Sequence, residues 1–167
     1  TISKLCVYLI NNLRFALLWL SLLTTGDKPM GLDSYAYAAK EVQQHPTEPC
    51  AVIFGKEDES GEYTTFNEVI DLNYWRKFNA LHSWMDQLYQ SKGGTEPFNC
   101  LKLPLTLEDL QALETTCKNQ ELKPTTGFFF GSQEPVTKEE YLDVLNFIKE
   151  ARDYINKGYI VCYDSWW

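Results

Sequence analysis

The sequence predicts a single α+β domain in which a small, mostly antiparallel sheet packs against about three helices. Three observations lead to this fold class. Hydrophobic residues make up 44% of the chain, enough to bury a core of ordinary size. Short strand-like segments precede a central amphipathic helix. Two helix-start signals, at Thr106 and Thr137, then precede a final strand-like segment.

Residues 1–29 differ in composition from the rest, so we expect the domain to span residues 30–167. Segment 5–25 is apolar but carries a central Arg14, which costs about 2.5–3.5 kcal/mol on membrane-insertion scales. The leader can be read as a spanning helix or as a signal peptide. The break in composition favours a third reading, in which the native protein begins at Met30 and the leader is translated upstream sequence.

The first strands are expected directly after this leader. Residues 31–38 alternate as a strand does, with Leu32 on one face and the tyrosines on the other. Residues 50–54 form an apolar run, and the charged segment 55–61 reads as a turn. This pattern predicts a hairpin between 50–54 and 62–66.

The central helix is expected over residues 74–89, started by an Asp71 or Asn73 cap and ended at 92–94. At about 100° per residue, one stripe faces the core. That stripe holds Tyr74, Phe78, Leu81, Met85, Leu88 and Tyr89. The boundary between core and solvent holds Trp75, Asn79, His82 and Asp86.

The boundary position of His82 allows two readings. A histidine there titrates near neutral pH, and it has an amide at i−3 and a carboxylate at i+4 on the same surface, an arrangement that can bind a polar ligand. In the structural reading, which we favour, His82 bonds Asp86 or a neighbouring loop and closes the core edge. Trp75 is then a core-rim residue.

The second half of the chain predicts two helices and a last strand. Thr106–Asp109 and Thr137–Glu140 are capping boxes, and the second helix is expected to end at 156–158. Segment 124–132 holds three phenylalanines between glycines, which suggests a short buried strand or a tight crossing and, more weakly, an anion-binding loop. Residues 159–167 read as a strand inside the sheet.

Composition excludes several classes of function. The net charge of −8 and the absence of a Lys/Arg run disfavour a nucleic-acid partner, which needs clustered cations. The five cysteines are widely spaced without a C-x-x-C pair, so we expect no metal and no cofactor. They are Cys6, Cys50, Cys100, Cys117 and Cys162. An odd count fits reduced, mostly buried thiols in a cytoplasmic protein.

Four motifs together resemble a family of small bacteriophage and prophage proteins. They are MGLDxY from Met30, YWRKxNAxHxW from Tyr74, TTGFFFGS from Thr125, and YxSW from Tyr163. The resemblance spans residues 30–167 and departs from the family pattern at Phe78, at Met85 and over 45–65. It implies a phage source, a host-cytoplasmic setting and a start at Met30, but no established activity.

The resemblance also implies candidate binding residues on the central helix. They are Trp75, Arg76, Lys77, Asn79 and His82, with Asp33, Thr126 and Ser132 as expected neighbours in space. The leading hypothesis is a non-enzymatic binding module that engages a host protein or a small polar ligand through the 74–89 helix. We expect no membrane partner unless the leader is retained.

The alternative hypothesis is a small hydrolase or transferase acting on a phosphorylated or nucleotide-like metabolite. His82 would be the general acid/base, and Asp33 or Asp86 would orient it. Arg76 or Lys77 would hold the anion. In a third reading the helix motif is only a folding signature, with Trp75 and His82 buried against 128–130.

Overall fold

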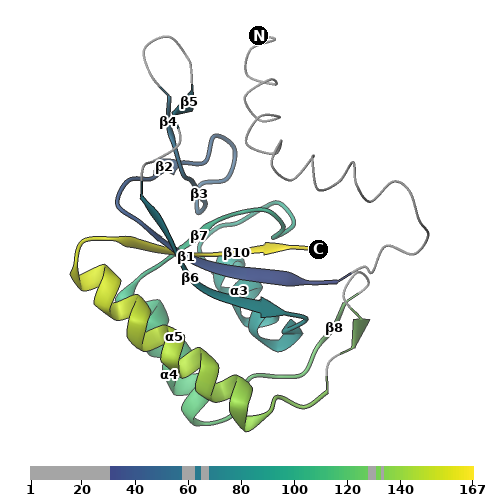
Figure 1. Ribbon diagram of the computed structural model, residues 1–167. Helices are drawn as coiled ribbons and strands as arrows, with labels where there is room; N and C mark the ends of the chain where they lie inside the picture. The colour runs from purple at the N-terminus through teal and green to yellow at the C-terminus, as the bar shows by residue number, and fades with distance from the viewer. Residues whose placement is uncertain (1–30, 58–62, 65–67, 128–130, 133) are drawn as a thin grey trace, which may run out of the picture.

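The computed structural model describes residues 31–57, 63–64, 68–127, 131–132 and 134–167 (Figure 1). The described elements, in chain order, are β1 (Asp33–Ala39), β2 (Gln43–Gln44), β3 (Val52–Ile53), β4 (Lys56–Glu57), β5 (Tyr63–Thr64), β6 (Val69–Arg76), α3 (Asn79–Ser91), β7 (Leu103–Leu105), α4 (Leu107–Lys118), β8 (Thr126–Gly127), β9 (Gly131–Ser132), α5 (Lys138–Asn156) and β10 (Ile160–Trp166). Together they form the predicted α+β fold.

A four-stranded sheet in the order β6-β1-β10-β7 organises the domain. Each strand is antiparallel to its neighbours. The last strand, β10, lies between β1 and β7, as predicted for the end of the chain. Three two-stranded ribbons, β2-β3, β4-β5 and β8-β9, stand apart from this sheet. None of the helices in the described ranges has both the length and the apolar character needed to cross a bilayer.

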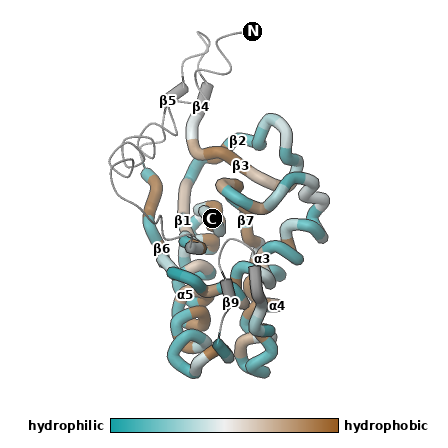
Figure 2. Tube along the Cα trace, turned by 90° about the vertical axis from the view of Figure 1, so that its right-hand side faces the viewer, coloured by the Kyte–Doolittle hydropathy of each residue, from teal (hydrophilic) through white to brown (hydrophobic). Residues whose placement is uncertain are grey.

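The helices cover one face of the sheet, while β2 to β5 rise on the other side (Figures 1 and 2). Strand alternation explains which side chains meet the helices. In β1, the small Ser34, Ala36 and Ala38 are fully buried and let the helices approach closely. Tyr35 and Tyr37 alternate with these small residues along β1 and therefore lie on the opposite face, as the sequence pattern predicts.

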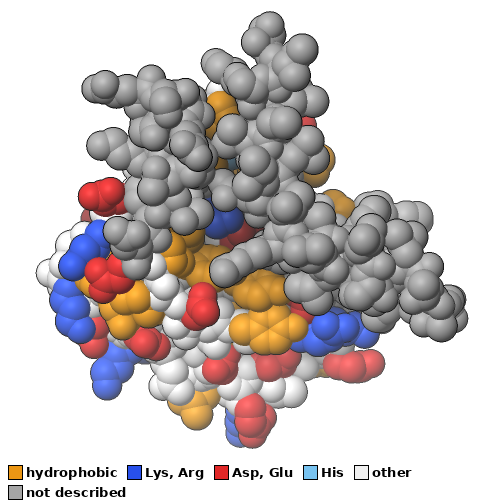
Figure 3. All heavy atoms as spheres, turned by 45° about the horizontal axis from the view of Figure 1, so that its top comes forward, with side chains coloured by type: hydrophobic (Ala, Val, Ile, Leu, Met, Phe, Trp, Pro, Cys, Tyr) orange, Lys and Arg blue, Asp and Glu red, His pale blue; other side chains and the backbone are white. Residues whose placement is uncertain are grey.

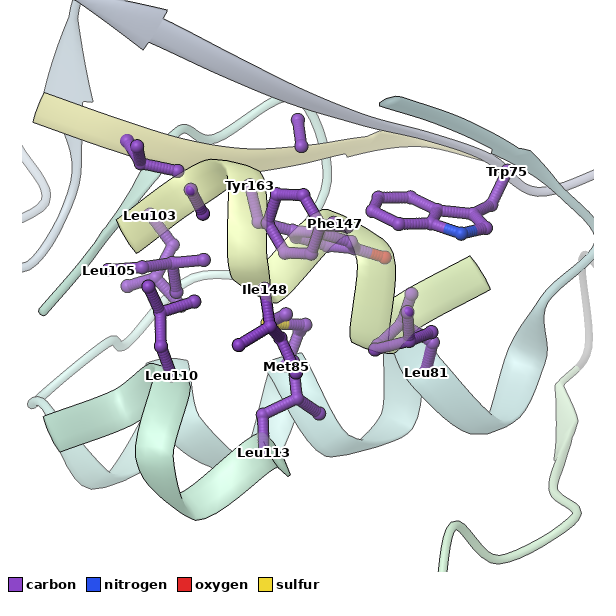
Figure 4. Close-up of a cluster of buried hydrophobic side chains, with 14 of the residues drawn as sticks. Trp75, Leu81, Met85, Leu103, Leu105, Leu110, Leu113, Phe147, Ile148 and Tyr163 are labelled. Atoms are coloured by element: carbon purple, nitrogen blue, oxygen red, sulfur yellow. The ribbon is translucent and has the colours of Figure 1, made fainter. Parts of the chain in front are cut away.

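The core fills the space between the sheet and the three described helices (Figure 4). Trp75 of β6 and Tyr163 of β10 point from the sheet toward Phe147 of α5. The Trp75 and Phe147 rings meet edge to face with centroids 5.2 Å apart. Leu110 and Leu113 of α4 close the other side of this cluster.

Both predicted capping boxes are confirmed. The Thr106 hydroxyl accepts from the backbone N–H of Asp109, whose carboxylate accepts from the Thr106 N–H. Thr137 and Glu140 do the same for α5. These reciprocal bonds satisfy N–H groups that the first turn of a helix leaves free. The helix α5 ends at Asn156 before Gly158, which has a φ of +83°, as glycine permits.

The predicted helix over 74–89 is wrong at its start. Strand β6 continues to Arg76, and α3 begins only at Asn79. The chain turns between them at Lys77, whose φ is +56°. The capping position is Phe78, without a side-chain cap. Pairing with β1 takes up the backbone groups of β6, so the aromatic pattern there belongs to a strand. The helix ends at Ser91 before a Lys92 C-cap, where it was expected to stop.

The predicted hairpin is also wrong in its pairing. Strand β3 pairs with β2, whereas β5 pairs with β4, so the apolar run 50–54 and segment 62–66 do not face each other in the described ranges. Residues 128–130 lie outside the described residues. Cys50, Cys117 and Cys162 are buried and Cys100 is exposed, all four as free thiols.

Candidate functional site

The structure separates the residues predicted to bind a partner through the 74–89 helix. Trp75 and Arg76 are neighbours in β6 and therefore point to opposite faces of the sheet. Trp75 is only 6% exposed, and its indole N–H donates to the Asp143 carboxylate at 2.5 Å. Arg76 lies on the face away from the helices, where its guanidinium pairs with Asp33 at 3.2 Å.

His82 is a core residue and is only 4% exposed. Its Nδ1 lies 3.3 Å from the Tyr163 hydroxyl, which donates to Ser34 Oγ at 2.8 Å. The imidazole stacks on Phe98 with ring planes 7° apart and centroids at 5.6 Å. Burial lowers the pKa of His82 to about 4. The imidazole is therefore neutral at physiological pH and sits within an aromatic layer.

The remaining candidates are dispersed. Asn79 is buried in the first turn of α3, and the Lys77 backbone N–H donates to the carbonyl of Leu32 at 2.7 Å. The Asp86 carboxylate accepts from Gln90 at 2.9 Å. Thr126 and Ser132 face each other across the β8-β9 ribbon. The sheet itself lies between His82 and Asp33, so Asp33 is not placed to orient the His82 imidazole.

A different cluster of aromatic side chains occupies the face of the sheet away from the helices. We call it the tyrosine face and define it as Tyr35, Tyr37, Tyr74 and Phe54 with the charged residues Asp33, Asp71, Arg76, Lys102 and Asp164. Tyr74 and Tyr35 lie on neighbouring strands with ring centroids 5.2 Å apart. Tyr35 and Tyr37 stack at 6.0 Å, and Tyr37 meets Phe54 edge to face at 5.8 Å.

Two ion pairs border the row of rings. Asp33 accepts from the Tyr74 hydroxyl at 2.5 Å and pairs with Arg76. At the other end, the Lys102 ammonium lies 3.0 Å from the Asp164 carboxylate and 5.4 Å from the centroid of the Phe54 ring. Each carboxylate is enclosed more deeply than its cation, with side-chain exposures of 11% and 13% against 50% and 29%.

The hydroxyls of this face remain protonated donors across physiological pH. Burial raises the pKa of Tyr37, and the carboxylates of Asp164 and Asp71 raise it further. Burial, followed by Asp33, likewise raises the pKa of Tyr35. For Tyr74, the hydrogen bond to Asp33 is the largest cause of a raised pKa. A ligand on this face would meet phenolic O–H groups next to carboxylate acceptors.

Sequence reasoning missed the tyrosine face, although one signal was present. Ala36 and Ala38 alternate with the tyrosines of β1, and small residues on one face of a strand leave room for helices to pack there. The larger side chains must then point the other way. Which side of the sheet carries helices is a tertiary fact, so the tyrosines could equally have been the core face.

Within the part of the chain that the structure describes, no group of three His, Cys, Asp or Glu side chains is placed to hold a metal ion. Figure 3, in which the top of Figure 1 comes forward, shows hydrophobic side chains gathered on the visible face with acidic and basic side chains around them. Comparisons with protein-family models, curated proteins and solved structures found no match.

Proposed function

We propose that the protein is a non-enzymatic binding module that engages a host protein or a small polar ligand in the cytoplasm of the host cell. Its binding surface is the tyrosine face, to which the 74–89 segment contributes only Tyr74 and Arg76. The observation that carries this proposal is the row of three tyrosines and Phe54 on the side of the sheet away from the helices. Tyr74 is 49% exposed in this row.

The composition of this face is that of a binding surface. Tyrosine, tryptophan and arginine are enriched at protein interfaces and supply many of the side chains that dominate binding energy. Tyrosine offers a large contact area with only two side-chain torsions to immobilise. The sheet beneath is paired on both sides at β1, so the rings of Tyr35 and Tyr37 stand on a rigid element.

Other surfaces of the domain are less suited to this role. The inner side of α3 is buried in the core. Strand β6 lies at the edge of the sheet, but the backbone N–H of Tyr74 donates to the Asn73 side chain at 2.9 Å. This bond occupies a group that an added strand would need.

The hydrolase or transferase reading has less support from the described residues. His82 is buried and neutral, and the Arg76 cation that would hold an anion lies on the opposite face of the sheet. A general acid/base must reach the proton that it transfers. Trp75, chosen from sequence as a binding residue, is a core residue, so its replacement would test folding more than binding.

The test compares wild-type protein with Tyr35→Ala and Tyr74→Ala in a thermal-shift screen of nucleotides, sugar phosphates and amino-acid metabolites. Host-lysate proteins captured by the wild type are then purified and titrated individually. Leu142→Ala on α5 is the matched control, because Leu142 is 59% exposed and lies on the helical side. A binder lost in both tyrosine variants and kept in the control supports the proposal. A binder kept in both variants but lost in a His82→Gln variant that is shown to be folded supports the enzyme reading.

A further inference from the structure

One end of the tyrosine face combines aromatic rings and carboxylates in a way that suits a cation. We call this end the Tyr37 corner and define it as Tyr37, Phe54, Asp71, Lys102 and Asp164. The chain already places a cation here, since the Lys102 ammonium lies against Phe54 and pairs with Asp164. Cations are attracted to ring faces, and the attraction grows when a carboxylate lies close by.

A second carboxylate in the corner, that of Asp71, has no ion-pair partner among the described residues. Asp71 is opposite Tyr37 in the pairing of β6 with β1, so both side chains lie on the same face. Asp71 is exposed. The carboxylate of Asp71 also contributes to the raised pKa of Tyr37.

The net charge of the tyrosine face also favours a cationic partner. Among the residues that define the tyrosine face, the three carboxylates of Asp33, Asp71 and Asp164 and the two cations of Arg76 and Lys102 leave a net charge of −1. The chain as a whole carries −8. An anionic partner would meet repulsion both locally and from the surrounding field, whereas a basic partner is attracted.

Building on the proposed function, we propose that the partner presents an arginine-containing basic peptide segment and that one guanidinium occupies the Tyr37 corner. The guanidinium pairs with Asp71 and lies against the Tyr37 ring. Arginine is preferred to lysine because its planar guanidinium stacks on aromatic rings and bonds a carboxylate through two N–H groups.

Three blocked hexapeptides provide the probes: alternating Gly and Arg, alternating Gly and Lys, and alternating Gly and Glu. Each is titrated into the full chain, followed by calorimetry and by NMR of the labelled protein. The arginine peptide is expected to bind more tightly than the lysine peptide, and the glutamate peptide is expected not to bind. Raising the salt concentration should weaken the interaction, because charges near the surface are screened.

Two substitutions locate the interaction. Asp71→Asn is expected to weaken arginine-peptide binding about 1.5- to 5-fold, the range equivalent to one partly exposed ion pair. Tyr37→Leu is expected to weaken it further, because the ring face is lost. Asp153→Asn removes the same charge from an exposed position on α5 and should leave binding unchanged.

The outcomes separate this inference from the proposed function. Equal losses in Asp71→Asn and Asp153→Asn would mean general attraction to an acidic protein and would overturn the assigned corner. If a neutral peptide or an oligosaccharide shifts the tyrosine-face resonances while the arginine peptide does not, the partner chemistry is wrong and the binding function stands. If the arginine peptide, every ligand of the screen and every captured host protein leave those resonances unmoved, both proposals fail.

Discussion

The imidazole of His82 is held in the core between Phe98 and the Tyr163 hydroxyl. Burial lowers its pKa from an ordinary 6.5 to about 4. Between these pH values the unfolded chain binds a proton that the folded chain does not. The free energy of unfolding contributed by neutral His82 is therefore complete above about pH 6.5 and is lost as the pH falls toward 4, by about 3 kcal/mol in total.

Urea unfolding at pH 4.5 and at pH 7 tests this expectation. His82→Gln should flatten the pH dependence across that interval, and NMR titration of the wild type should place the His82 midpoint near 4. The comparison variant is His45→Gln. Burial also lowers the pKa of His45, whose ring accepts from the Glu48 N–H, so this variant measures how much of the pH dependence comes from the second histidine. A His82 midpoint near 6.5 would contradict the buried placement.

Gly94 lies in contact with the ring of Tyr89. A Cβ at Gly94 would fall 2.3 Å from Cε1 and Cζ of that ring. The ring cannot move easily, because it is fully buried, stacks on Phe98 at 4.6 Å and donates its hydroxyl to Glu48 at 2.6 Å. We expect Gly94→Ala to lower the free energy of unfolding by about 1–3 kcal/mol through overpacking.

The comparison for Gly94→Ala is Gly93→Asn at the preceding position. A Cβ at Gly93 meets no atom within 4 Å, and asparagine tolerates positive φ better than most residues do. Its cost should be below about 1 kcal/mol, since only a conformational penalty applies. Equal losses of stability in the two variants would show that the Tyr89 contact is not the cause.

A buried carboxylate links the β2-β3 ribbon to α3 and to the segment that follows this helix, beside the backbone bridge from Val52 to Lys102. Glu48 is 1% exposed and accepts from the Tyr89 hydroxyl and from both the N–H and the hydroxyl of Thr95. The hydrogen bond from Tyr89 is the main cause of its lowered pKa. From the same ribbon, the Gln44 side chain donates to three carbonyls of the 48–51 turn.

Glu48→Ala should therefore loosen this ribbon more than the four-stranded sheet, although the bridge from Val52 to Lys102 remains. The expected result is faster amide hydrogen exchange over residues 43–53, with β1 and β10 exchanging at wild-type rates, because local opening releases the element with the fewest remaining contacts. Hydrogen exchange followed by mass spectrometry measures this. Glu41→Ala, at an exposed position before the ribbon, should leave exchange unchanged.

The domain as a whole has two layers, one of helices and one formed by the sheet. The core lies on the helix side of the sheet, and the proposed binding surface lies on its other side. Tyr74 and Trp75 are adjacent in sequence, yet Trp75 packs into the core and Tyr74 is half exposed on the other face. We expect Trp75→Ala to cost about 3–5 kcal/mol of unfolding free energy, as for large buried aromatics. Tyr74→Ala should cost about 1 kcal/mol or less, mainly its hydrogen bond to Asp33.

Parallel urea titrations of the two variants measure this difference. Leu113→Ala is the reference for a core truncation, since Leu113 is fully buried in α4, and it should cost about 2–5 kcal/mol. Similar losses in Tyr74→Ala and Trp75→Ala would mean that both residues share one environment, as in the helix expected from sequence.

Features set by neighbouring residues could be predicted well. The capping boxes at Thr106 and Thr137 depend on residues three positions apart, and the predicted bonds are present. The β10 strand and the alternation of β1 also follow from local pattern. The candidate site could not be predicted in this way, because Tyr35, Tyr74 and Asp164 come together only when distant strands pair.

The sequence by itself determined the α+β class, the starts of α4 and α5, the end of α5, and the alternation of β1, because these depend on interactions between residues a few positions apart. Only the tertiary structure decided whether segment 74–76 is strand or helix and which face of the sheet is covered. Pairing with β1 satisfies the backbone of β6 and makes Trp75 part of the core. The same pairing leaves Tyr74 on the uncovered side of the sheet, beside Tyr35.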